Sequence, residues 1–130
     1  MKYTQPDRHG LNAYIFPVYV LLIAYASLSP FTGWRVPEGA VFHFLTVWPR
    51  YITRFDVLIN ILAYLPLGFL VALSLRRLRG GMLILAATGV GAAVSLGMET
   101  LQVFVPGRIA SITDLLTNTA GSLAGAVSAH

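Results

Sequence analysis

The residues of this chain that could do chemistry occur twice in the same order. The motif Arg-x-x-Thr/Ser-x-x-Asp-x-Leu-x-Asn stands at 50–60 and again at 108–118, with each residue 58 positions from its counterpart. A Thr or Ser three residues before an Asp is typical of a helix start, because both side chains can bond backbone N–H groups that lack partners there. We therefore predict two related helical hairpins whose second helices begin on the same side.

The polar residues of both copies are expected to converge on one site. Asp and Asn are four residues apart in each copy, so they share one face of a helix. A third apolar run contributes two more polar residues, spaced three apart, near the same end. The predicted ligand-binding residues are Glu99, Gln102, Arg108, Asp114, Asn118, Asp56, Asn60 and Arg50.

Glu99 is the strongest candidate among them. An ionised carboxylate in a membrane helix costs ~2.5–3.5 kcal/mol on insertion scales. A glutamate near the C-terminal end of its helix gains nothing from the helix dipole. We expect a site role for Glu99, with Arg108 as its partner or as an anion ligand.

The other polar residues also have purely structural interpretations. Asp56 and Asp114 could cap helices, worth ~0.3–1 kcal/mol each. Asn60 and Asn118 could bond neighbouring helices, worth ~0.6 kcal/mol on average. His43 has no second ligand at metal-binding spacing, so no metal or other cofactor is expected.

Composition indicates that the chain lies in lipid. Of its 130 residues 56% are hydrophobic and 11% are charged, whereas a soluble domain carries about 25% charged residues. The net charge of +4 comes from arginines at the ends of apolar runs, so a nucleic-acid partner is not expected. With no cysteine, thiol chemistry is excluded.

The apolar runs predict an all-α, polytopic transmembrane bundle of about four helices, built from the two repeated hairpins. The expected spans are approximately 13–29, 56–75, 82–104 and 112–129, within a single domain covering 1–130. The last is only ~27 Å long as a helix. Aromatic residues crowd 31–55, which predicts an interfacial loop with a short helix around 39–48.

Small residues predict which helices touch. Small residues form stripes at four-residue spacing in the third and fourth spans: Gly89, Ala93 and Gly97 in the third, and Thr117, Gly121, Gly125 and Ala129 in the fourth. Such stripes let helix backbones approach closely in lipid. We expect the third and fourth helices to pack on each other.

Three ordered motifs resemble one known family. They are Asp56-Val-Leu-Ile-Asn60-Ile-Leu-Ala-Tyr64-Leu-Pro66-Leu-Gly68-Phe, Glu99-Thr-Leu-Gln102-Val-Phe-Val-Pro106-Gly107-Arg108 and Ser111-Ile-Thr-Asp114-Leu-Leu-Thr-Asn118-Thr-Ala-Gly121. The chain resembles the VanZ-like membrane proteins over nearly its whole length. That family is named after a teicoplanin-resistance accessory protein, so the resemblance implies a role in the bacterial cell envelope and a place in the cytoplasmic membrane.

The chain departs from the family pattern at one position. Many VanZ-like proteins have Asp-Lys-x-x-His where this sequence has Asp56-Val-Leu-Ile-Asn60. Asparagine does not titrate, so Asn60 is not expected to transfer a proton.

The sequence is compatible with two main classes of function, and a third is a further alternative. In the first, a non-enzymatic envelope protein binds an amphiphile or a lipid-linked headgroup at an outer polar site and affects glycopeptide tolerance. The ligand would be a membrane lipid, a lipid-linked cell-wall precursor or a glycopeptide. Arg108 and Arg50 would hold phosphate or carboxylate, and Glu99, Asp114 and Gln102 would accept donors from sugar or amine groups.

The second class is a membrane-embedded enzyme acting on a lipid-linked substrate through Glu99 and Asp114. No Ser-His-Asp arrangement is visible in the sequence, so catalysis would need a carboxylate-activated water or a metal. The third is a small transporter, which would have to form a homo-oligomer to enclose a pathway.

The first span has a second interpretation. Lys2 and Arg8 precede its apolar core, and Ala24-Tyr25-Ala26 fits the small-x-small pattern of signal-peptide cleavage. A retained first helix and a removed signal peptide are both compatible with the sequence.

Arginine placement predicts the orientation of a four-span chain. An inside N-terminus puts Lys2, Arg8, Arg76, Arg77 and Arg79 in the cytoplasm and Arg35, Arg50, Arg54 and Arg108 outside. The three arginines packed into the short second loop should dominate, because short basic loops stay cytoplasmic. Both termini are therefore expected in the cytoplasm.

A reporter fused after His130 checks this orientation. Green fluorescent protein at that position should fluoresce, and alkaline phosphatase should be inactive, because each works on one side of the membrane only. The reverse pattern would place the arginine loop outside and invert the predicted topology.

Overall fold

The computed structural model describes residues 8–130 and forms four long helices. They are α1 (Arg8–Leu28), α2 (Arg54–Ser74), α3 (Gly80–Gln102) and α4 (Ile112–Ala129). One turn of 3-10 helix, η1 (His43–Leu45), lies in the long loop where a short helix was predicted. The described residues contain no strand, so the all-α prediction is confirmed. Lys2 lies outside the described residues.

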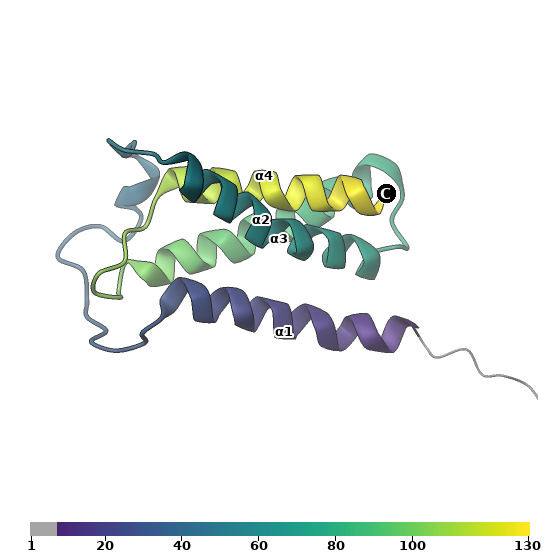
Figure 1. The fold of residues 1–130 in the computed structure, drawn as a ribbon, viewed down its shortest axis with the longest axis horizontal. Coiled ribbons are helices and arrows are strands. Elements are labelled where there is room, and N and C mark those ends of the chain that lie inside the picture. The colour runs from purple at the N-terminus through teal and green to yellow at the C-terminus, as the bar shows by residue number, and fades with distance from the viewer. Residues whose placement is uncertain (1–7) are drawn as a thin grey trace, which may run out of the picture.

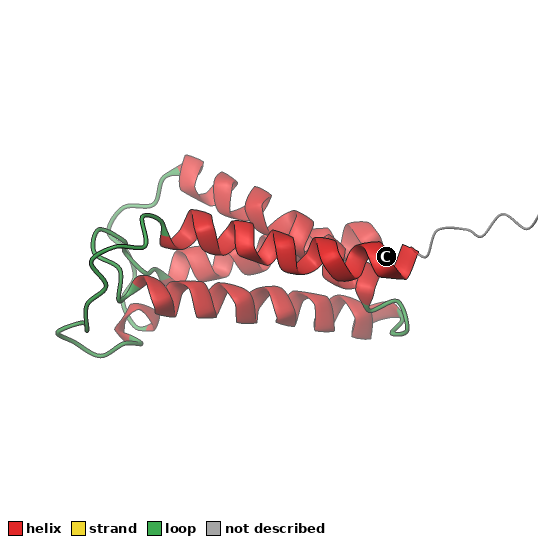
Figure 2. Cartoon of the chain, turned by 90° about the horizontal axis from the view of Figure 1, so that it is seen from below, coloured by secondary structure: helices red, strands yellow, loops and turns green. Residues whose placement is uncertain are grey.

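Successive helices run in opposite directions along one bundle (Figures 1 and 2). The C-terminal ends of α1 and α3 therefore meet the N-terminal ends of α2 and α4. We call this the loop end, because residues 29–53 and 103–111 connect the helices there. The opposite end carries the 75–79 turn and is called the arginine end. α1 lies along α2 and α3, whereas α4 packs chiefly on α2 and also on α3.

The second helix of each predicted hairpin begins where the motif places it. Thr53 is the N-cap of α2, and its hydroxyl accepts a hydrogen bond from the Asp56 N–H at 3.0 Å. Ser111 is the N-cap of α4, and its hydroxyl accepts from the Thr113 N–H at 3.1 Å. The hydroxyl caps are confirmed at both starts, whereas the Asp56 carboxylate accepts from the Thr53 hydroxyl and the Ser111 N–H goes to Glu99 and not to Asp114. That the two hairpins are related in structure stays a prediction.

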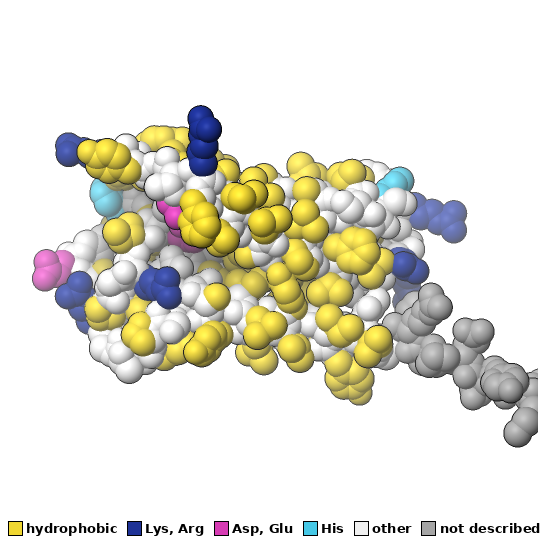
Figure 3. Space-filling view, in the orientation of Figure 1, with side chains coloured by type: hydrophobic (Ala, Val, Ile, Leu, Met, Phe, Trp, Pro, Cys, Tyr) yellow, Lys and Arg dark blue, Asp and Glu magenta, His cyan; other side chains and the backbone are white. Residues whose placement is uncertain are grey.

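Three helices are long and apolar enough to cross a membrane. They cover Gly10–Leu28, Arg54–Ser74 and Gly80–Gln102, and α4 is not among them. Charged side chains gather at the two ends of the bundle, and hydrophobic side chains cover the length between (Figure 3). Hydrophobic side chains facing outward along a bundle are what a lipid environment requires.

Glycines bring α2 and α4 into backbone contact. A Cβ at Gly125 would strike the Leu65 carbonyl, and one at Gly121 would strike the Ile61 carbonyl. From the α2 side, a Cβ at Gly68 would strike the backbone of Ser122. The small-residue stripe of α4 therefore faces α2, and not α3 as the sequence suggested. The backbones can approach this closely because each glycine places no side chain between them.

α3 uses a different stripe from the predicted one. Its buried residues are Leu83, Ala87, Gly91, Ser95 and Glu99, again at four-residue spacing. Gly89 and Gly97 of the predicted stripe have open space where a Cβ would stand. α3 and α4 do touch, as expected, but through the neighbouring face.

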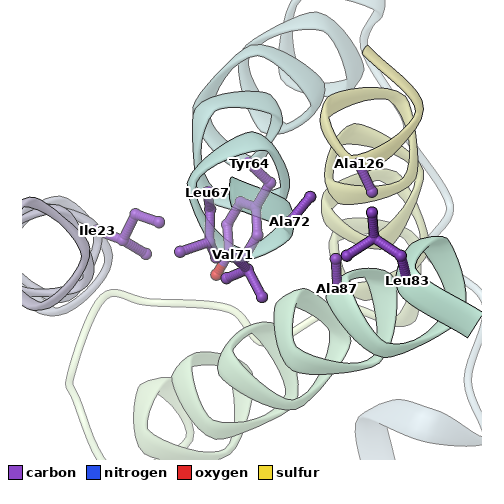
Figure 4. Close-up of a cluster of buried hydrophobic side chains, with 8 residues drawn as sticks. All are labelled: Ile23, Tyr64, Leu67, Val71, Ala72, Leu83, Ala87 and Ala126. Carbon is purple, nitrogen blue, oxygen red and sulfur yellow. The ribbon is translucent and has the colours of Figure 1, made fainter. Parts of the chain in front are cut away.

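The apolar core lies between the middle of α2 and the facing helices (Figure 4). Ile23 of α1 points toward Leu67 of α2, while Leu83 of α3 and Ala126 of α4 point toward each other. Nearer the loop end, α3 and α4 bury the polar residues Ser95, Glu99 and Asn118. The core therefore fixes the helices that position the polar site.

A matched pair of glycine substitutions tests this packing. Gly125→Ala should destabilise the protein, because its methyl group would separate α4 from α2. Gly89→Ala should be neutral or stabilising, since alanine improves helix propensity by about 1 kcal/mol where space is open. Thermal unfolding of both variants in detergent measures the difference. Equal loss in both would contradict the α2–α4 interface.

Candidate functional site

A polar cavity opens at the loop end, between all four helices. Its volume is about 370 Å³. It is lined by Tyr19, Leu22, Ile23, Ala26, Ser27, Ile59, Asn60, Ala63, Tyr64, Glu99, Gln102, Arg108, Asp114 and Asn118. Six of the eight predicted site residues are in this set. On the face that Figure 3 shows, acidic side chains lie recessed in a hollow near the loop end.

Glu99 lies at the junction of α3 and α4. It is 2% exposed, and its Oε2 accepts a hydrogen bond from the Ser111 N–H at 2.8 Å. Ser111 is the N-cap of α4, so this N–H belongs to the backbone groups that a capping box would satisfy from position N3. The N3 residue is Asp114. Because Glu99 takes the N–H instead, the Asp114 carboxylate is left to face the cavity.

Arg108 holds the end of α1 and does not form the expected ion pair with Glu99. Its Nε and one Nη donate to the Ser29 carbonyl at 3.1 and 2.8 Å, and that Nη also donates to the Ala26 carbonyl at 3.0 Å. α1 ends at Leu28, where carbonyls lack intrahelical partners and the helix dipole favours a cation. These carbonyls attract the guanidinium away from the carboxylate.

The amide side chains bond neighbouring helices through their N–H groups. Asn60 donates to Thr117 Oγ1 at 3.2 Å, Gln102 to the Ser27 carbonyl at 3.1 Å and Asn118 to Ser95 Oγ at 2.9 Å. The structural interpretation of both asparagines therefore holds. The same side chains also line the cavity.

Two predicted residues lie away from this cavity. Asp56 is exposed, bonds the Thr53 hydroxyl and lines a separate cavity of about 240 Å³ that it shares with Asp114. Arg50 is exposed and lines neither cavity. The two copies of the motif thus contribute unequally, because only Asn60 of the first copy reaches the main cavity.

The sequence analysis did not select two tyrosines of the site. The Tyr19 hydroxyl donates to the Ala63 carbonyl at 2.7 Å and joins α1 to α2. Tyr64 is buried, and its hydroxyl has no hydrogen-bond partner among the described residues. The available signal was helical spacing, since Tyr64 follows Asn60 by one turn and therefore shares its face.

Among the residues whose side chains are described, no three His, Asp or Glu come together as a metal site would require. The cavity instead offers two carboxylates, amide oxygens and tyrosine hydroxyls beside apolar side chains. Such a mixture is typical of a site that binds a small polar group next to an apolar one.

A double-mutant cycle tests the separate roles of Glu99 and Arg108. Glu99→Gln should change stability little, because an amide oxygen can still accept from the Ser111 N–H. Arg108→Ala should cost about 1 kcal/mol, less than a buried charged hydrogen bond because the side chain is exposed. The double variant should show the sum within ~0.5 kcal/mol in thermal unfolding, since the two share no partner. Strong coupling would indicate an ion pair after all.

The comparisons with known proteins agree with this architecture. The family described as VanZ/LLP1 matches residues 9–130. No curated protein and no solved structure matches the chain. The match covers all four helices and both copies of the motif, and it confirms the resemblance seen in the sequence. This membrane protein therefore belongs to the VanZ/LLP1 family.

Proposed function

We propose that this protein binds the polar headgroup of an amphiphile in the cavity at the loop end. The observation that carries the proposal is an open cavity, lined by Glu99, Asp114 and three side-chain amides beside apolar residues, in a bundle with three apolar candidate membrane spans. Polar residues inside membrane helices mark functional sites because they are costly to keep there. The predicted orientation places this end on the extracytoplasmic face of the bacterial cytoplasmic membrane.

An opening toward lipid supports an amphiphile as the ligand. Leu22 of α1 and Ile59 of α2 both line the cavity, and they are 58% and 46% exposed. In a membrane these side chains face acyl chains, so a lipid could enter between α1 and α2. Its tail would remain against Leu22 and Ile59 while its headgroup occupied the cavity.

The size of the cavity supports a headgroup and not a whole lipid. A volume of about 370 Å³ lies at the small end of the range of roughly 300–1,000 Å³ for ligand sites. Membrane lipids and lipid-linked cell-wall precursors both present headgroups next to acyl chains. Through such a ligand the protein would act in the cell envelope and affect glycopeptide tolerance.

Binding is favoured over catalysis because the described residues that line the cavity include no His or Cys that could serve as base or nucleophile. Glu99 holds the Ser111 N–H with one oxygen, and its other oxygen can accept a hydrogen bond from a ligand. We therefore assign Glu99 and Asp114 to ligand recognition.

Two substitutions on α1 test the proposal. Ala26 is exposed and lines the cavity, so Ala26→Phe should fill the opening without disturbing the core. Ala13 is exposed on the same helix but does not line the cavity, which makes Ala13→Phe the matched control. Lipids that copurify with the detergent-extracted protein should be lost from Ala26→Phe only.

Native mass spectrometry measures the retained lipid directly. Equal lipid retention by both variants and the unsubstituted protein would contradict binding in the cavity. Loss of the copurified lipid from both variants would mean that this lipid covers α1 as bulk membrane lipid and is not bound in the cavity.

A further inference from the structure

Several donors that line the cavity are engaged within the protein. Asn60, Gln102 and Asn118 each direct one N–H to a protein oxygen at 2.9 to 3.2 Å. Arg108 directs its Nε and one Nη to carbonyls at the end of α1. The second N–H of each amide, the other Nη of Arg108 and the Tyr64 hydroxyl remain as neutral or outlying donors beside the acidic groups.

The strongest acceptors of the cavity are two carboxylates. Asn118 is 4% exposed, and its Oδ1 has no hydrogen-bond partner among the described residues. Glu99 uses Oε2 on the Ser111 N–H, which leaves its second oxygen. Asp114 adds a carboxylate with the Asn60 amide beside it. A buried acceptor without a donor is costly, so these oxygens favour a ligand that supplies N–H or O–H groups.

Charge selects among such ligands. The carboxylates of Glu99 and Asp114 line the cavity. Asp56, at the start of the neighbouring helix, lies close enough to Asp114 for the two carboxylates to repel each other. Arg108 is the sole arginine that lines the cavity, and its guanidinium lies against α1 carbonyls. Arg50, expected to help hold an anion, lies outside. A phosphate placed deep in the cavity would face carboxylates, whereas a cation with several N–H donors would complement them.

We propose that the cavity selects an amphiphile whose headgroup carries a primary ammonium, with its N–H groups donated to the Glu99 and Asp114 carboxylates. This inference rests on the proposed function and specifies its ligand class. The three N–H donors of a primary ammonium match acceptors on α3 and α4. A trimethylammonium group has the same charge but no N–H, so it leaves these acceptors unpaired.

Competition between two lipids tests the proposal. The purified protein in mild detergent receives equal amounts of phosphatidylethanolamine and phosphatidylcholine with identical acyl chains, and native mass spectrometry counts the lipids retained. Phosphatidylethanolamine should be retained in excess by roughly tenfold, the ratio that the loss of one charge-assisted hydrogen bond gives. Equal retention, or an excess of phosphatidylcholine, would overturn the proposal.

Charge-neutral variants locate the preference. Asp114→Asn should reduce the ratio to near one, and it should fold because the Ser111 hydroxyl provides the cap of α4. Glu99→Gln, which keeps an acceptor for the Ser111 N–H, provides a second variant. Glu38 is an exposed carboxylate of the long loop that does not line the cavity, so Glu38→Gln should leave the ratio unchanged. An unchanged ratio in both cavity variants would overturn the proposal.

Further measurements distinguish a failure of the ammonium assignment from a failure of the proposed function. Glycerophosphoethanolamine, which has the same headgroup without acyl chains, should not displace the lipid at equal concentration; displacement would overturn the membrane source of the ligand. Preferred retention of phosphatidylglycerol would overturn the ammonium assignment while leaving the proposed function intact. Lipid retention unaffected by Ala26→Phe would instead overturn the proposed function itself.

Discussion

The hydrogen bond from the Ser111 N–H to Glu99 determines the geometry of the loop end. It joins the last turn of α3 to the first residue of α4, across the turn that includes Gly107 at a φ of 79°. A carboxylate accepting a backbone N–H in a buried position is a strong, charge-assisted interaction. Because Glu99 takes this N–H, the Asp114 carboxylate is not needed at the helix start and remains in the cavity.

The two copies of the motif differ at this interaction. The residue 58 positions before Glu99 is Val41, so the first hairpin has no equivalent carboxylate. There Asp56 stays with the Thr53 hydroxyl at the start of α2 and is exposed. At the first helix start Asp56 lies beside the cap, whereas at the second Glu99 takes the Ser111 N–H and Asp114 lines the cavity.

Polar contacts at the loop end also determine how α1 joins the bundle. The Gln102 side chain and Arg108 bond carbonyls at its C-terminal end, and Tyr19 bonds the Ala63 carbonyl. Most of its remaining surface is exposed. In lipid, apolar contact alone contributes little to helix association, so these hydrogen bonds carry much of the attachment. Tyr19, Gln102 and Arg108 therefore line the cavity and also attach α1, its wall nearest lipid, to the rest of the bundle.

The sequence predicted the helices and the gathering of polar residues, but not their partners. Apolar runs and the Thr53 and Ser111 caps predicted the helix starts, since both signals are local. The α3 stripe was misassigned, because Gly89 and Gly91 both belong to small-residue stripes and only packing decides between them. The partner of Arg108 was missed because the competing carbonyls lie some 80 positions earlier in the chain.

The central claim is that a lipid headgroup occupies the cavity with its tail between α1 and α2. A phosphatidylethanolamine with an intact headgroup and a diazirine near its acyl carbonyl tests this directly when it is irradiated with the protein in vesicles. The account predicts cross-links at the opening, on the peptides that contain Leu22 and Ile59, and their loss when unlabelled phosphatidylethanolamine competes. Cross-links spread evenly along the exposed faces of the helices, or gathered at the arginine end, would contradict it.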